Sequence, residues 1–163
     1  MDALNTLLKT TLLLVLLGLL VVAGTIVKNW PPMLDAPGPL VRLGTYLTTN
    51  TVETHEHAIR PELRNRLYAA SPRETWEAAR AAVQDLGWNV IHSDPDSLII
   101  QAIAETPLLR FEGDIYIQVR DADPDLSTVY FRASSRIGRG DFATNTRHLL
   151  DFRTRLEEAL MAQ

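Results

Sequence analysis

Arginine and serine side chains gather in one short stretch of the chain, and these residue types suggest anion binding. Arg132, Ser134, Ser135, Arg136 and Arg139 lie at the expected end of a strand, just before an expected helix. Arginine forks bind carboxylates and phosphates, and the N–H groups at a helix N-terminus favour anions. The stretch therefore predicts a site for a lipid phosphate, a substrate carboxylate or an acidic loop of a partner.

A structural explanation of the same stretch remains open at this point. Arg136 can pair with Asp141 or Asp114 and hold the loop in place, and Asn145 can cap the helix that follows. Arg147 is a further candidate for pairing inside the chain. In this interpretation the charged residues stabilise the fold and bind no ligand.

Other chemical constellations are weaker. His55 and His57 lie on one side of an extended segment with Glu53, but zinc or iron needs three or four converging ligands. The acidic turn 121–125 lacks the glycine and glutamate of a calcium loop and predicts a hairpin. The chain has no cysteine, no Gly-x-Ser-x-Gly motif and no phosphate-binding glycine loop. We therefore expect no metal, no cofactor and no enzymatic activity.

An uncharged apolar segment, residues 10–27, precedes these groups. As a helix it is roughly 27 Å long, close to the ~30 Å hydrocarbon thickness of a bilayer. We expect an uncleaved membrane anchor; a cleaved signal peptide and a buried core helix are the alternatives. Pro31 and Pro32 should end the helix. The residues expected to contact the membrane are Leu12, Leu13, Leu16, Leu17, Leu19, Leu20, Val22, Ile26 and Trp30.

Hydrophobic periodicity predicts the elements that position the candidate site. Ser71 and Glu74 form a capping box for a helix that ends near Leu86, and a last helix begins near Thr144. Between them the alternation predicts strands over residues 88–92, 98–104, 111–119 and 128–134. Short connections make the sheet antiparallel. The expected fold class is α+β: one N-terminal transmembrane helix, then a two-layer sandwich of a four-stranded antiparallel sheet and two helices.

Composition bounds the organisation of the chain. We expect an anchor over residues 1–28, a Pro- and Gly-rich linker over 29–45 and a globular domain over 46–163. The net charge is −4, and the segment through Lys28 contributes +1, so the remainder is −5. Such a charge disfavours nucleic-acid binding. The short leader before the apolar run favours the inner (cytoplasmic) membrane with a periplasmic domain.

The segment Arg132–Arg147 reads RASSRIGRGDFATNTR and resembles the defining motif of domain-of-unknown-function family number 1499. Segments 50–61 and 110–114 resemble further motifs of that family, so the resemblance covers about residues 46–160. Thr51 and Ala143 stand where the family has cysteine and glycine, so no thiol, haem or disulfide role transfers. The resemblance implies a fold, no established activity, and occurrence in photosynthetic lineages. The residues that match the motif are Arg132, Ser135, Arg136, Gly138, Asp141, Asn145 and Arg147.

Three functional hypotheses follow. The first is a non-catalytic, membrane-anchored accessory subunit of a larger membrane protein complex, photosynthetic or respiratory, with membrane lipid and an integral membrane complex as partners. The second is a membrane-tethered module that binds a lipid, an anion or a small molecule through the arginine-rich loop 132–139. A tethered hydrolase of unrecognised type is a third and weaker interpretation.

Overall fold

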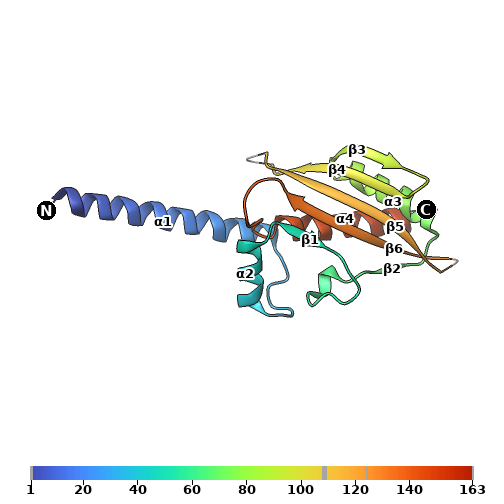
Figure 1. Cartoon of the computed structure of the whole chain (residues 1–163), viewed down its shortest axis with the longest axis horizontal. Helices are drawn as coiled ribbons and strands as arrows, with labels where there is room; N and C mark the ends of the chain where they lie inside the picture. Colours follow the sequence, from blue (N-terminus) through green and yellow to red (C-terminus); the bar gives the residue numbers. More distant parts are fainter. Residues whose placement is uncertain (1, 108–109, 124, 163) are drawn as a thin grey trace.

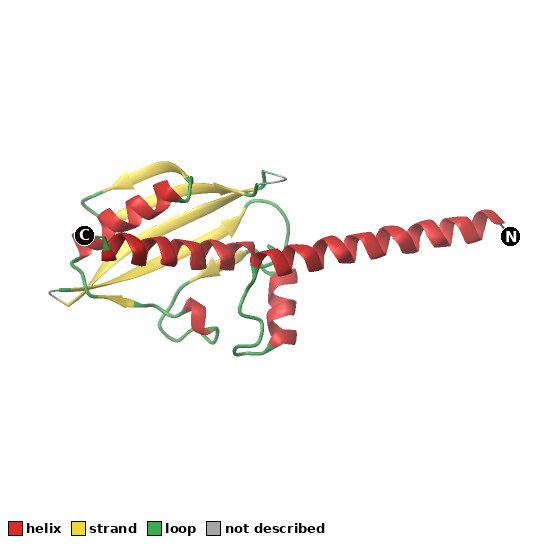
Figure 2. Cartoon of the chain, turned by 180° about the vertical axis from the view of Figure 1, so that it is seen from behind, coloured by secondary structure: helices red, strands yellow, loops and turns green. Residues whose placement is uncertain are grey.

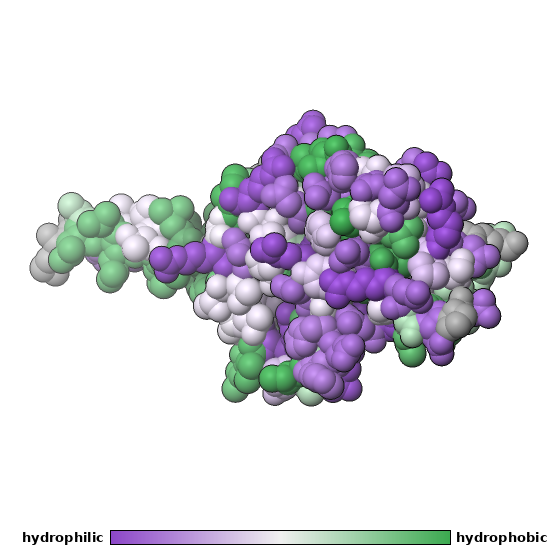
Figure 3. All heavy atoms as spheres, turned by 45° about the vertical axis from the view of Figure 1, so that its right-hand side comes forward, coloured by the Kyte–Doolittle hydropathy of each residue, from purple (hydrophilic) through white to green (hydrophobic). Residues whose placement is uncertain are grey.

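A long helix leaves one end of an α+β domain (Figure 1). The computed structural model describes residues 2–107, 110–123 and 125–162. Helix α1 (Asp2–Asn29) contains a 27-residue stretch, Ala3–Asn29, that is long and apolar enough to cross a membrane; a signal sequence meets the same criterion. Hydrophobic residues, in green, are prominent along α1, whereas the visible surface of the domain is mainly hydrophilic (Figure 3).

Helix α1 is fastened to the domain at its end. Ile26 is buried, and the Asn29 side-chain amide donates to the Phe142 carbonyl oxygen at 2.8 Å and to Thr144 Oγ1 at 3.2 Å. Trp30 adopts a positive φ of 44°, and Pro31 and Pro32 follow, so that the helix cannot continue. The end of α1 therefore contacts the start of the last helix, α4 (Thr144–Met161).

The sheet is antiparallel throughout, with strand order β1-β6-β5-β4-β3. Strand β2 also pairs with β6, near the start of that strand, whereas β1 pairs near its end. Helices α3 (Pro72–Asp85) and α4 cover one face of it (Figure 2). The core lies between the two layers and includes Trp76, Ile117, Phe131 and Phe152. The strands are β1 (Thr51–Glu53), β2 (Leu67–Tyr68), β3 (Asn89–Asp94), β4 (Ile99–Glu105), β5 (Glu112–Asp123) and β6 (Leu126–Ser135).

The predicted class, α+β with an antiparallel sheet after an apolar helix, is confirmed, but the predicted numbers of elements are wrong. The described residues form six strands rather than four, and four α-helices, α1 included, together with a 3-10 helix, η1 (Pro61–Leu63). Strands β1 and β2 have three and two residues, too few for an alternating pattern to be recognised in the sequence. The capping box at Ser71 is present as predicted.

Helix α2 (Pro39–Thr48) lies where the sequence predicts a linker and runs across the boundary placed at residue 45. It crosses the direction of α1 at the end of the domain from which α1 emerges (Figures 1 and 2). Its buried residues are Arg42 and Tyr46. The polar side of this helix therefore faces the domain, the reverse of the usual arrangement in a globular protein.

Candidate functional site

The face of the sheet opposite α3 and α4 is open, and strand alternation sets its residues. Ile115, Ile117 and Val119 of β5 point into the core, so the residues between them point outward. Register places Gln101 of β4, Tyr116 of β5 and Arg132 of β6 directly opposite one another. An amide, a phenol and a guanidinium thus form one polar row across three strands.

A shallow hollow of about 370 Å³ lies over this row. The Arg132 guanidinium is exposed there and, among the described residues, makes no ion pair or hydrogen bond. Most of the polar groups around it can donate hydrogen bonds, so the hollow suits a ligand or partner group that accepts them. The lining residues are Ile91, Gln101, Ala102, Asp114, Ile115, Tyr116, Arg132 and Ser134.

A second aromatic group extends the open face along the sheet. The Tyr130 ring lies edge-to-face with Tyr116, with centroids 5.9 Å apart, and Arg120 stacks over it at 4.6 Å. The Tyr130 hydroxyl donates to a Glu53 carboxylate oxygen at 2.7 Å. Partial burial is the main cause, and this hydrogen bond the second, of a rise in the pKa of Tyr130 to about 12. The phenol therefore remains a neutral donor over the physiological pH range.

The predicted arginine and serine cluster does not form one site, because β6 directs alternate residues to opposite faces. Arg132 and Ser134 lie on the open face, and Ser134 Oγ is 3.0 Å from Thr51 Oγ1. Ser135 lies toward the helices, where its hydroxyl accepts a hydrogen bond from the Asn145 amide at 3.0 Å. Arg139 is exposed in the loop between β6 and α4. The cluster is thus divided among a face, an interior contact and a loop.

Arg136 forms internal ion pairs, as the structural alternative anticipated. Its guanidinium is 2.6 Å from an Asp114 carboxylate oxygen and also contacts Glu112. The hydrogen bond with Asp114 is the main cause of a raised pKa for Arg136. Arg147 likewise pairs with Asp151, one turn further along α4, at 2.6 Å. Both guanidinium groups thus have carboxylate partners within the chain.

Motif side chains bond to the backbone at the end of β6 that lies nearest α1. The Asn145 amide donates to the Asn50 carbonyl oxygen at 2.8 Å. The Asn50 amide in turn donates to the Ser135 and Gly138 carbonyl oxygens. These bonds tie the segment before β1 to the end of β6 and to α4. The motif therefore defines a structural junction, with Thr51 at the cysteine position bonded to Ser134.

Asp141, rather than Asn145, caps α4. Its two carboxylate oxygens accept the backbone N–H groups of Ala143 and Asn145, each at 3.0 Å. Burial raises the pKa of Asp141 above its usual value, and these two hydrogen bonds act against that rise. Ala143 has a positive φ of 68° in front of the helix. Glycine adopts a left-handed conformation without strain, and glycine is the residue that the family resemblance implies at this position.

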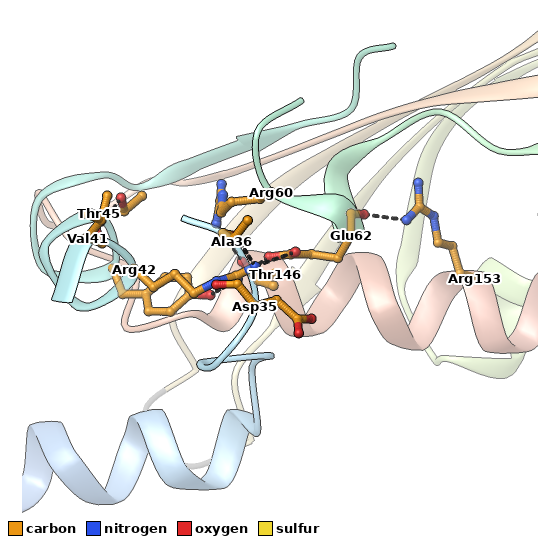
Figure 4. A network of polar contacts seen from close by, with 10 residues as sticks. Asp35, Ala36, Val41, Arg42, Thr45, Arg60, Glu62, Thr146 and Arg153 are labelled. Carbon is orange, nitrogen blue, oxygen red and sulfur yellow. Dashed lines mark hydrogen bonds and ion pairs between the residues drawn. The ribbon is translucent and has the colours of Figure 1, made fainter. Parts of the chain in front are cut away.

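A buried ion pair joins α2 to the rest of the domain (Figure 4). Arg42 contacts both carboxylate oxygens of Glu62, at 2.6 and 2.9 Å, and its side chain is 0% exposed. It also donates to the Tyr46 hydroxyl and to the carbonyl oxygens of Asp35 and Ala36. This group was not predicted from the sequence, because its partners are separated along the chain and its one local signal is a single arginine in an otherwise uncharged segment.

Arg153 of α4 continues this network from the other side. Its guanidinium donates to the Glu62 carbonyl oxygen and, at 2.7 Å, to the Arg64 carbonyl oxygen. The buried contacts thus connect the segment after α1, helix α2, the residues around η1 and helix α4. Their arrangement is that of a structural network, since each guanidinium bonds to protein acceptors.

The remaining predicted residues lie outside the sheet face. Within the described ranges no three His, Asp or Glu side chains come together as a metal-binding group would require. Of the predicted membrane-contacting residues, Trp30 is 76% exposed and Ile26 is buried against the domain. Val22 is half-buried. The others are exposed on α1, namely Leu12, Leu13, Leu16, Leu17, Leu19 and Leu20.

The architecture is that of a small α+β domain carried by one candidate membrane-spanning helix. The family described as protein of unknown function (DUF1499) matches residues 44–156, and the chain belongs to this family. This match confirms the resemblance identified from the motif in residues 132–147. A search of curated proteins finds no match.

A solved structure also matches the chain. The crystal structure of TTHA0849 from Thermus thermophilus has a TM-score of 0.42 and 13% sequence identity. The match covers 69% of this chain and 97% of that chain.

Proposed function

We propose that the chain is a non-catalytic, membrane-anchored accessory subunit that presents the open face of its sheet to a larger membrane protein complex. The observation that supports this best is the attachment of α1. Only 6% of its most apolar 18-residue stretch is buried within the chain, yet the end of the helix is bonded to Phe142 and to the start of α4 through Asn29. A helix so exposed needs lipid or other helices around it, and the bonded end holds the sheet at a set orientation.

The open face supplies the contact surface in this proposal. Tyr116, Tyr130 and Arg132 are of the residue types that dominate binding energy at protein interfaces. The hydrogen-bond donors around Arg132 favour an acidic or carbonyl-rich partner surface. A photosynthetic or respiratory complex is the proposed partner class, and the proposed location is the inner membrane with the domain in the periplasm.

The test is gentle detergent extraction of the full chain from its native membrane, followed by native mass spectrometry. We expect co-migration with a large assembly, and we expect Arg132→Glu to reduce it. Arg66→Glu is the matched control, because Arg66 is exposed and pairs with Glu157 away from the open face. Extraction of a monomer alone under conditions that keep other complexes intact would overturn the proposal.

A second candidate function follows from the hollow itself. A volume of about 370 Å³ beside the Arg132 guanidinium could hold a small anionic metabolite or a lipid headgroup. In this case native mass spectrometry would detect a monomer with a bound small molecule, and Arg132→Glu would release the molecule. The same experiment therefore separates the two functions.

A further inference from the structure

Helix α2 has its amphipathic character reversed with respect to the domain. Arg42 and Tyr46 are 0% and 1% exposed, whereas Leu40, Val41 and Leu47 are 83%, 56% and 41% exposed. Arg42 is the helix's one charged residue, so the outward face has no charge at all. Exposure of such an apolar face to water is unfavourable. The polar side of α2 is buried against the domain, where a helix of a globular protein normally buries its apolar side.

The reversed orientation is fixed rather than incidental. The Arg42 guanidinium bonds to Glu62, to the Tyr46 hydroxyl and to the carbonyl oxygens of Asp35 and Ala36. Turning the helix over would place that guanidinium in the lipid or water and leave the Glu62 carboxylate buried without a partner. The domain therefore holds outward the apolar side of α2, formed by Leu40, Val41, Leu43 and Leu47 and called here the leucine face.

Successive contacts place α2 at the level where α1 leaves the domain. Asn29 bonds to the Phe142 carbonyl oxygen, and the Phe142 N–H bonds to the Tyr46 carbonyl oxygen. A Cβ atom on Gly140 would lie 2.7 Å from that same carbonyl oxygen, so loop and helix are in direct contact. Helix α2 runs across the direction of α1 (Figures 1 and 2), so a membrane that α1 crossed would have its surface parallel to α2.

The residues beside α2 have the composition of a membrane interface. Trp30, Leu34 and Ile137 are 76%, 87% and 65% exposed. Lys28 in the last turn of α1 and Arg139 in the loop that contacts α2 add two positive charges, against one negative charge from the exposed Asp35 before α2. Exposed aromatic and aliphatic side chains next to basic ones are typical of helices that lie in the headgroup region and contact anionic lipids.

We propose that α2 is an in-plane interfacial helix, with Leu40, Val41, Leu43 and Leu47 inserted among the lipids of the leaflet on the domain side. The occupant of the apolar face is thus the bilayer surface, continuous with the lipid around α1. The domain rests on the membrane through two crossing helices rather than hanging from one. This inference depends on membrane anchoring by α1, which belongs to the proposed function, but it does not depend on association with a complex.

The test uses the absence of cysteine in the chain. Single variants Leu40→Cys and Leu47→Cys of the full-length protein are spin-labelled and reconstituted alone in vesicles of phosphatidylcholine and phosphatidylglycerol. Collision rates with oxygen, which concentrates in lipid, and with a water-soluble nickel chelate then report the surroundings of each label. Leu67→Cys is the matched control, because Leu67 is 68% exposed on β2, at the other end of the domain (Figure 1).

We expect the ratio of oxygen to nickel collisions to be several times higher at positions 40 and 47 than at position 67. Val41→Cys provides the same readout if either leucine variant fails to fold. Equal ratios at positions 40, 47 and 67 would overturn the inference. They are the result expected if the natural occupant of the apolar face of α2 is another protein, because the vesicles lack that protein and the face would then be in water. For the same reason, failure to find a partner complex leaves this measurement unaffected.

Discussion

At the scale of single residues, the polar groups that the sequence analysis considered for binding divide into two kinds. Arg136, Arg147 and Asn145 are engaged with other parts of the chain. Arg132, by contrast, makes no ion pair on the open face with any residue that the structure describes. The arginine that matters most for the architecture is Arg42, which no motif indicates. Its removal should therefore have a larger effect on stability than the removal of any exposed arginine.

Arg42→Ala should lower the free energy of unfolding by about 3–5 kcal/mol, because it leaves the Glu62 carboxylate buried without its partner. The measurement is denaturant unfolding of the detergent-solubilised protein, followed by tryptophan fluorescence. Replacing both partners with apolar residues, Arg42→Met with Glu62→Leu, should be much less harmful.

The matched control for this prediction is the exposed pair of Arg66 and Glu157, at 48% and 43% side-chain exposure. Arg66→Ala should change stability by less than about 1 kcal/mol. Equal losses for Arg42→Ala and Arg66→Ala would contradict the role assigned to the buried pair.

His148 should make the protein less stable in mild acid. Burial lowers its pKa to about 4, against an ordinary value of 6.5, and nearby Asp151 only partly opposes this. The unfolded chain then binds a proton that the folded chain does not, so stability falls as pH decreases from about 6.5 toward 4. Between pH values of about 7.5 and about 5 the loss should be about 2 kcal/mol.

Unfolding of His148→Phe at the same two pH values checks this prediction. The phenyl ring can keep the edge-on contact with Trp88, whose centroid is 5.5 Å from that of His148, and it has no proton to bind. The difference between the two pH values should therefore shrink. His92→Gln, at an exposed position, should leave the difference as it is.

At the scale of elements, the junction of α2, the loop after β6 and the start of α4 determines how the domain meets α1. Gly140 lies directly against α2, since a Cβ atom there would meet the carbonyl groups of Tyr46 and Leu47. Asp141 and Phe142 donate their backbone N–H groups to Thr49 and Tyr46. The loop therefore acts as a backbone-to-backbone support for the end of α2.

Gly140→Ala should destabilise the protein by about 1–3 kcal/mol, because the added methyl group must push two backbone carbonyls away. Thermal unfolding with circular dichroism detection measures the loss. Gly44→Ala in α2 is the control: nothing lies within 4 Å of its Cβ position, so better helix propensity should raise stability by up to about 1 kcal/mol. Similar values for the two variants would argue against a close contact at Gly140.

Regular elements with long patterns were predictable from the sequence. The capping box located α3, and alternation located β4, β5 and β6, because each has enough residues for a period to appear. Helix α2 was missed for a physical reason. Pro37 and Gly38 before the helix and Pro39 at its start suggest a linker. The polar side of the helix turns inward, so the sequence shows no apolar face of the kind that a core helix has.

The candidate site was predictable only in part. Arg132 and Ser134 were identified from the sequence, but Gln101 and Tyr116 were not. Both alternate with buried residues along their strands, β4 and β5. Strand parity could have indicated both. Which residues become neighbours across β4, β5 and β6 depends on the register of the two hairpins, which the turn geometry sets together with the buried face. The turns were predicted only as to their place, so the register was not. The division of residues 132–136 between two faces follows from the same parity.

At the scale of the whole molecule, the exposed helix α1 is joined to the domain by a short set of contacts. Asn29 donates to Phe142 and Thr144, and Ile26 is buried beside them. These contacts, rather than the covalent connection alone, fix the angle between α1 and the sheet. Weakening these contacts should change the orientation of the domain relative to α1.

Asn29→Ala should loosen the attachment of α1 while leaving the protein in the membrane fraction. Two labels, at Leu20→Cys in α1 and Leu67→Cys in β2, report the distance between helix and domain by pulsed electron spin resonance in vesicles. We expect a broader distance distribution in the Asn29→Ala background. Thr25→Ala is the control, because Thr25 bonds within α1, to the Val21 carbonyl oxygen. An unchanged distribution for Asn29→Ala would mean that α2 and the loop suffice to hold the angle.

Helix α4 begins at the contact with α1 and runs the length of the domain, so the two chain termini lie at opposite ends of the molecule (Figure 1). A fluorescent or enzymatic reporter fused behind α4 would project away from the anchor and would cover neither the polar row nor the leucine face. Such a fusion can therefore reveal which compartment receives the domain while both of these surfaces stay uncovered.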